Sequence, residues 1–167
     1  MDDRMERFIE KAKELGSHEA KFIDPATVKT APWVIMKCRY GCGRYNTRLC
    51  CPPHTPTYTE TREIIDCYKT ALLVHCKSWD IVTPIIAKLE KEIFLSGYYK
   101  VFGFGSGPCK SCRPCNMVKC IKPQEVRPAM EACGIDVYET VRANGFPIDV
   151  VKDFDCEQNC YGLLLID

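Results

Sequence analysis

Thirteen cysteines in 167 residues dominate the chemistry that this sequence can perform. Most of them fall into two groups, one between residues 38 and 54 and the other between residues 107 and 123. In a short secreted chain such a density indicates a disulfide framework, whereas in a reducing cytosol it indicates metal ligation or redox chemistry. The odd number of cysteines fits a fully paired disulfide scaffold poorly. We therefore interpret the cysteines as metal ligands.

The second group has the spacing of an iron–sulfur loop. Its cysteines are separated by two, two and four residues: Cys109, Cys112, Cys115 and Cys120. Three cysteines at two-residue gaps let one loop wrap three irons of a [4Fe–4S] cluster, as in bacterial ferredoxins. The ferredoxin run closes with a three-residue gap, and its fourth cysteine can ligate another cluster. Spacing alone therefore does not assign the fourth ligand here; Cys120 is the first choice, and a remote cysteine is the alternative.

Two other chemistries fit parts of the same loop. Zinc is also bound by pairs of cysteines two residues apart, so zinc is the alternative metal. A thioredoxin-like dithiol would use Cys109 and Cys112 alone and needs no third cysteine at the next two-residue step. The three-cysteine run favours the iron–sulfur interpretation.

The first group offers four further candidate ligands: Cys38, Cys42, Cys50 and Cys51. Three arginines lie among them and would offset the charge of an anionic cluster or meet an acidic partner. The radical-SAM spacing is absent, because seven residues separate Cys42 from Cys50. The adjacent Cys50 and Cys51 cannot easily bind one metal site together, so one of them is expected to be structural or to serve a different cluster. We predict a second cluster near this group.

The remaining cysteines are assigned by their sequence context. Cys156 and Cys160 could complete either site, and His54 is a further candidate ligand. Three cysteines within apolar patterns are expected in the core: Cys67, Cys76 and Cys133.

The sequence predicts a small sheet with flanking helices that would position the two cysteine groups. Apolar runs predict strands at 20–23, 33–36, 71–76, 99–104 and 161–166. Helical periodicity predicts helices at 3–15, 59–68, 84–96, 125–132 and 138–143, with Thr59 and Thr83 as N-caps. The order strand, helix, strand across 71–104 implies a right-handed crossover and a parallel pair. We predict one α/β or α+β domain over 1–167, with a partly parallel sheet and the cysteine loops at one end.

Composition excludes several function classes. A net charge of +1 favours neither nucleic acid nor a membrane surface. The first residues lack the apolar region of a signal peptide, and no apolar run approaches the roughly 20 residues that cross a bilayer. A cytoplasmic location is expected. The glycines at 103, 105 and 107 invite a dinucleotide-loop interpretation, but prolines and cysteines follow where a helix should begin.

The cysteine motifs resemble a known family. The run C-x3-C-G-x-Y with C-C-P-P-H (38–54), G-P-C-x2-C-x2-C (107–115) and R-P-A-M-E-A-C-G-I-D-V (127–137) is similar to small cysteine-rich proteins described as predicted metal-binding proteins of unknown function. That resemblance implies metal binding, with iron–sulfur chemistry, in anaerobic bacteria and archaea. It assigns no activity, partner or catalytic residue.

The function expected from these features is electron transfer. One or two [4Fe–4S] clusters would pass single electrons to a redox partner protein or a cofactor-activating enzyme. Cluster-dependent catalysis on a small substrate and a zinc-stabilised interaction module are the alternatives. An electron carrier or accessory protein is favoured over an enzyme, because no acid–base constellation names a reaction.

Overall fold

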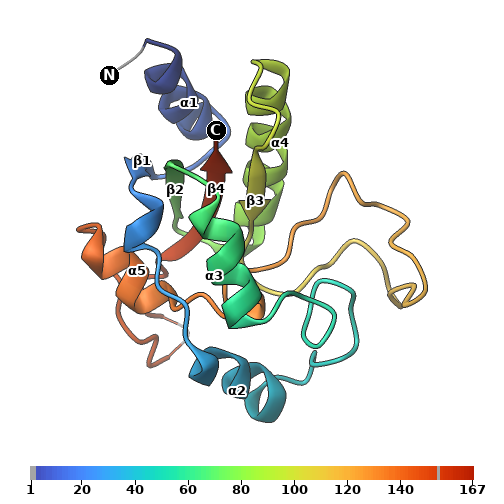
Figure 1. Ribbon diagram of the computed structural model, residues 1–167. Coiled ribbons are helices and arrows are strands. Elements are labelled where there is room, and N and C mark those ends of the chain that lie inside the picture. The colour runs from blue at the N-terminus through green and yellow to red at the C-terminus, as the bar shows by residue number, and fades with distance from the viewer. Residues whose placement is uncertain (1–2, 154) are drawn as a thin grey trace.

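A four-stranded antiparallel sheet forms the centre of the protein in the computed structural model, which describes residues 3–153 and 155–167 (Figure 1). The strands are β1 (Glu19–Ile23), β2 (Thr70–Cys76), β3 (Phe102–Phe104) and β4 (Cys160–Ile166). Their order across the sheet is β1-β2-β4-β3, and every neighbouring pair is antiparallel. The architecture is therefore α+β.

The prediction of a parallel pair was wrong for an instructive reason. β2 and β3 do run in the same direction, because each pairs antiparallel with β4. However, β4 lies between them. This C-terminal strand has the sequence CYGLLLI and is buried over six of its seven residues, so its apolar side chains gain most from a central position. β3 has only three residues and remains at the edge.

Helices cover both faces of the sheet. One face packs against α1 (Asp3–Glu14) and α4 (Val82–Leu95), and the other against α3 (Tyr58–Asp66) and α5 (Val137–Ala143). Side chains alternate along β4 as the pleat requires, so Leu163 and Leu165 face α3 and α5 while Leu164 faces α4. Both central strands are buried on two sides, which explains why they read as continuous apolar runs.

Two predicted elements were wrong. Residues 33–36 belong to helix α2 (Pro32–Gly41), which begins with Pro32 at its first turn; only Val34 of its residues is buried. Residues 125–132 form no α-helix, because Gly105 exchanges backbone hydrogen bonds with Pro128 and Met130. Only a single 3-10 turn, Glu131–Cys133, follows there.

Two predicted N-caps also moved. Helix α3 begins earlier than expected, with Thr57 and Glu60 forming a reciprocal capping box, so Thr59 is not the cap. Thr83 lies inside α4 and exchanges hydrogen bonds with the backbone of Ser106 at 3.3 Å. Thr83 thereby ties the start of the second cysteine loop to α4.

The glycines that follow β3 serve close packing. A Cβ atom at Gly103 would collide with Ile86 of α4, and a Cβ atom at Gly105 would collide with Thr83. Glycine is required there because the chain passes directly against the helix as it leaves the sheet. The longest helix in the described ranges, α4, has 14 residues, and none of these helices is long and apolar enough to span a bilayer.

Candidate metal centre

Two cysteine-rich loops meet beyond one end of the sheet. The first follows α2 and precedes α3, and the second connects β3 to the turn before α5 (Figure 1). The Arg48 side chain of the first loop donates a hydrogen bond to the carbonyl oxygen of Cys109 in the second. Segments that are 61 residues apart in the sequence are therefore in direct contact.

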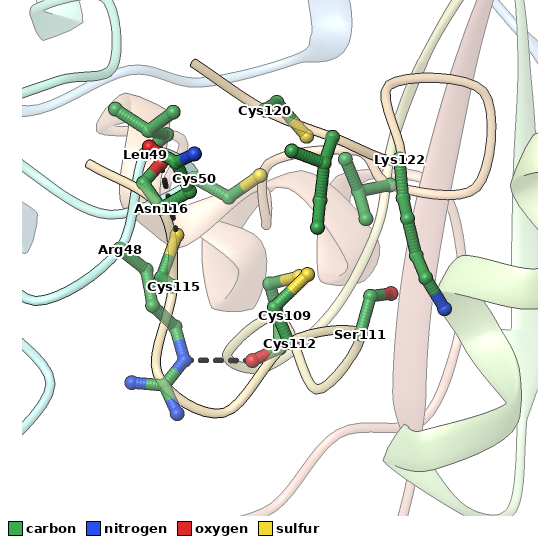
Figure 2. Close-up of a pocket in the computed structure, with 12 residues that line it drawn as sticks. Arg48, Leu49, Cys50, Cys109, Ser111, Cys112, Cys115, Asn116, Cys120 and Lys122 are labelled. Carbon is green, nitrogen blue, oxygen red and sulfur yellow. Dashed lines mark hydrogen bonds between the residues drawn. The ribbon is translucent and has the colours of Figure 1, made fainter. Parts of the chain in front are cut away.

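Five thiols line one cavity between these loops, and the region that they border holds about 370 Å³ of space including its open mouth (Figure 2). The second loop contributes the four predicted cysteines, and the first contributes Cys50. Figure 2 shows the sulfur atoms of Cys50 and Cys120 on one side of the space and those of Cys109 and Cys112 on the opposite side. Each of the five cysteines is partly exposed, so the cavity lies close to the surface.

Cys50 is the residue that the sequence did not assign to this cavity. Its burial, followed by the proximity of Cys109, Cys120, Cys51 and Cys115, raises its pKa to about 12. The metal-free protein therefore holds Cys50 as a neutral thiol, and a bound metal must displace its proton. The sequence analysis allowed for Cys50 only in general terms, as a remote cysteine that could replace Cys120 as the fourth ligand.

A second and larger hollow lies on the other side of the first loop. It is lined by three cysteines of the first group, Cys38, Cys42 and Cys51, and by Cys160 at the start of β4; Cys50 borders it as well. Cys38 lies in the last turns of α2, and Cys42 is the residue that follows the helix, with an extended backbone. Burial, followed by the charges of Cys42, Glu131 and Cys51, raises the pKa of Cys38 to about 11.

The two adjacent cysteines differ in the spaces that they line. Cys50 lines both the first cavity and the larger hollow, whereas Cys51 lines only the larger hollow. After burial, the charges of Cys109 and Cys120 raise the pKa of Cys50 most. Cys51 is 8% exposed and lies near Arg48, whose positive charge opposes the rise in pKa that burial causes. The expectation that one of the two is structural or serves a different cluster remains a prediction.

The remaining candidates lie elsewhere. His54 is exposed, and its Nε2 atom shares a hydrogen bond with Asn46 Oδ1 at 2.8 Å. Cys156 does not line either hollow in the part of the chain that the structure describes. Cys76 and Cys133 are fully buried, as expected. Cys67 is exposed at the end of α3, so its prediction as a core residue was wrong.

The thiols line the walls of these spaces and do not converge on a point. Within residues 3–153 and 155–167, no three His, Cys, Asp or Glu side chains lie close enough to hold a single metal ion. A tetrahedral zinc site needs sulfur atoms about 2.3 Å from one centre.

An almost buried ion pair anchors the far end of the second loop. Arg127 donates from Nε to Glu90 Oε2 at 2.6 Å and from a terminal nitrogen to Glu90 Oε1 at 2.5 Å. Glu90 Oε2 also accepts a hydrogen bond from the backbone of Gly103 at 2.8 Å. Because Gly103 belongs to β3, this bidentate pair fixes the loop to both α4 and the sheet.

The charged side chains of the two cysteine loops are all positive. Residues 38–54 and 107–123 hold seven of the 23 basic residues and none of the 22 acidic ones, so the rest of the chain has 16 basic against 22 acidic residues. The seven are Arg39, Arg44, Arg48, Lys110, Arg113, Lys119 and Lys122. A neutral overall composition thus conceals a basic region around the thiols, where an anionic thiolate cluster would be stabilised.

Comparisons with known proteins agree with a metal-binding role. Residues 21–166 match the family described as predicted metal-binding protein (DUF2284), whose function is unknown. No curated protein and no solved structure matches the chain significantly. Because the family match spans both cysteine loops, most of β1 and the other three strands, this chain belongs to the family of predicted metal-binding proteins.

Proposed function

We propose that the protein is an iron–sulfur protein that carries one or two [4Fe–4S] clusters and transfers electrons to a redox or cofactor-activating partner. The single observation that carries this proposal is the cavity walled by five thiols from two distant loops. Cys109, Cys112 and Cys115 would supply three ligands, and Cys120 or Cys50 the fourth. The first cysteine group would hold a second cluster through Cys38, Cys42 and Cys51.

The donor set of the first cavity fits a cubane cluster. The two-residue gaps place three thiols on one loop, and the sulfur atoms of Cys50 and Cys120 lie across the cavity from those of Cys109 and Cys112 (Figure 2). Such a cluster, when bound, supplies one-electron redox chemistry. The chain supplies the thiolates, apolar walls from Leu49, Ile121 and Val126, and the positive charge of Arg48.

The position of the cavity favours exchange of electrons with another protein. The second loop lies at the edge of the molecule (Figure 1). Its tip exposes apolar side chains, including Val118 at 95% and Ile121 at 63%, and Ile121 also lines the cavity. The neighbouring Lys119 and Lys122 are exposed and basic. An apolar patch with a basic rim suits an acidic redox protein, which long-range attraction would steer towards the cluster.

A second candidate function is cluster-dependent catalysis on a small substrate. The specific observation in its favour is the large hollow beside Cys38, Cys42 and Cys51, which contains about 1790 Å³ of space including its open mouth. A small molecule could occupy the space that a cluster leaves free there. Electron transfer remains the principal proposal, because the first cavity is lined by five thiols and by no acidic side chain.

A redox titration tests the electron-transfer proposal. The wild-type protein, purified anaerobically, should show a reversible one-electron couple, and Cys112→Ser should lose the couple that belongs to the first cavity. Cys67→Ser is the matched control, because Cys67 is an exposed cysteine outside both hollows. A metal-loaded protein without an accessible couple would rule out electron transfer.

A further inference from the structure

Cys76 and Cys160 lie directly opposite each other on the two central strands of the sheet. Cys76 ends β2 and Cys160 begins β4, and the antiparallel register pairs their Cα atoms. Cys76 belongs to the apolar cluster on the α4 face, and Cys160 packs against the same cluster, so both side chains point to one side of the sheet. Directly opposed Cα atoms of an antiparallel pair are about 4.5 or 5.5 Å apart, and disulfides span Cα separations of about 4.4–6.8 Å. The two free thiols therefore have the placement that a cross-strand disulfide requires.

Side-chain contacts beside this pair hold the strand ends in register. His75 Nε2 shares a hydrogen bond with Asn159 Oδ1 at 2.8 Å. The Lys77 side chain donates to the same oxygen at 3.2 Å. These three residues are immediate neighbours of Cys76 and Cys160 in the sequence. The two cysteines are thus kept opposite each other although they lie at the ends of their strands.

The surroundings of the pair favour a bond between the sulfurs over a metal ion. A tetrahedral metal site needs four donors around one centre. In the part of the chain that the structure describes, no three His, Cys, Asp or Glu side chains come close enough together to hold a metal ion, so the pair lacks a third donor. In reducing surroundings such a pair remains as two thiols, and the bond would form in response to an oxidant.

The two thiols differ in their access to solvent. Cys76 is fully buried, whereas Cys160 is partly exposed and borders the larger hollow. A dissolved oxidant can therefore reach Cys160 and cannot reach Cys76 while the sheet is intact. This difference sets the order of a thiol–disulfide exchange: the exposed thiol attacks first, and the buried thiol resolves the mixed disulfide from within the protein.

We propose that Cys76 and Cys160 form a reversible regulatory disulfide, which a small disulfide compound such as oxidised glutathione introduces. The Cys160 thiolate attacks one sulfur of the oxidant, forms a mixed disulfide and releases one glutathione. Cys76 then attacks the Cys160 sulfur, closes the protein disulfide and releases the second glutathione. Two protein thiols are oxidised, one glutathione disulfide is reduced to two thiols, and the protons of the cysteines pass to these products.

The disulfide would change the larger hollow. Because Cys160 borders that hollow, the bond to Cys76 occupies one of the thiols available there. An oxidising change in the surroundings would thereby alter the donor set of the hollow without touching the first cavity, which neither cysteine lines. This inference goes beyond the proposed function and does not depend on which metal the cysteine loops bind.

The test equilibrates the full chain, purified anaerobically, with mixtures of reduced and oxidised glutathione. Peptide mapping by mass spectrometry should find the peptide of Cys76 linked to the C-terminal peptide in oxidising mixtures, and the link should disappear on reduction. Cys76→Ala should accumulate about tenfold more mixed disulfide on Cys160 than the wild type, because the resolving thiol is absent. Cys160→Ala should leave Cys76 unmodified, because the oxidant cannot reach the buried thiol.

Cys156→Ala is the matched control. Cys156 is partly exposed, as Cys160 is, and lies only four residues before it, so the two can share one peptide in the digest. The link to Cys76 should persist in this variant. A link that persists in Cys160→Ala and disappears in Cys156→Ala would overturn the proposal, because Cys156 would then be the partner. A wild-type Cys160 that stays reduced, or that carries only glutathione in every oxidising mixture, would overturn it as well.

Discussion

The Nε atom of Arg48 lies 2.7 Å from the carbonyl oxygen of Cys109 and donates a hydrogen bond to it. This contact joins the two cysteine loops at the wall of the first cavity (Figure 2). Because the donor is charged, we expect the bond to contribute about 1.5–3 kcal/mol. The position of Cys50 opposite the second loop depends on this junction.

Replacing Arg48 should therefore loosen the cluster without removing a ligand. We expect Arg48→Met to release iron to a chelator about tenfold faster than the wild type, which corresponds to about 1.4 kcal/mol. Arg44→Met is the control, because Arg44 is exposed on the same loop and lines only the larger hollow. The loss of absorbance near 400 nm provides the rate, and equal rates for the two variants would refute a role for the Arg48 contact.

Cys50 and Cys120 should be able to replace one another as the fourth ligand. Both sulfur atoms face the same cavity, so Cys50→Ser and Cys120→Ser should each retain a four-iron cluster, with a shifted reduction potential. The double variant should lose that cluster. Iron analysis and redox titration of the three proteins make the comparison. Complete loss of the cluster in either single variant would show that the other thiol cannot substitute.

The ion pair between Arg127 and Glu90 should stabilise the fold at the base of the second loop. Their side chains are only 16% and 13% exposed, so removing one partner leaves an unpaired charge in a largely buried place. We expect Glu90→Gln to lower the free energy of unfolding by about 2–4 kcal/mol. The exposed pair between Lys122 and Glu125 is the control. Glu125→Gln should change the free energy of unfolding by less than about 0.5 kcal/mol. Urea unfolding of the metal-free proteins measures both.

The metal-free protein should lose stability in alkali. Burial is the largest cause that raises the pKa of Cys76 to about 11 and that of Cys133 to about 12, from an ordinary value of 9.0. The unfolded chain therefore releases these protons at lower pH than the folded chain does. Stability is complete below about pH 9 and falls as the pH rises towards 11, by about 1.4 kcal/mol per pH unit for each such thiol.

Urea unfolding between pH 8 and pH 10.5 measures this loss, and Cys76→Ala should reduce its slope. Cys67→Ala is the control, because Cys67 is exposed and should leave the slope unchanged. A slope that is the same in the wild type and Cys76→Ala would contradict the assignment of the alkaline loss to buried thiols.

The basic rim should control the rate of electron exchange. We expect reduction by an acidic redox protein to slow as the salt concentration rises, because screening weakens the attraction. Changing both Lys119 and Lys122 to Glu should slow reduction at low salt at least tenfold. Lys13→Glu and Lys88→Glu together provide the control on α1 and α4, with the same change in net charge. Equal rates for the two double variants would mean that the partner binds elsewhere.

The sequence predicted the parts of the fold that local patterns determine. The apolar run at 71–76 and the amphipathic pattern after Pro84 lie in β2 and α4 as expected. The run at 33–36 misled, because three of its four apolar side chains are at least partly exposed and α2 packs by Val34 alone. Nothing local could show that β4, 56 residues after β3, would insert between β2 and β3.

In the candidate sites, too, local spacing predicted some features, and contacts between distant segments determined the others. The spacing of Cys109, Cys112 and Cys115 placed them together, because consecutive two-residue gaps act within one loop. The presence of Cys50 in that cavity depends on the contact between two loops, which Arg48 and Cys109 make across 61 residues.

Metal analysis of the anaerobically purified protein tests the central claim most directly. Iron, sulfide and zinc would be measured beside the absorption spectrum, in the wild type and in Cys109→Ser. Our account predicts a brown protein with broad absorption near 400 nm, matching iron and sulfide, and about four fewer irons in the variant. A colourless protein that holds one or two zincs and no sulfide would contradict it, and the cysteines would then support a structural role.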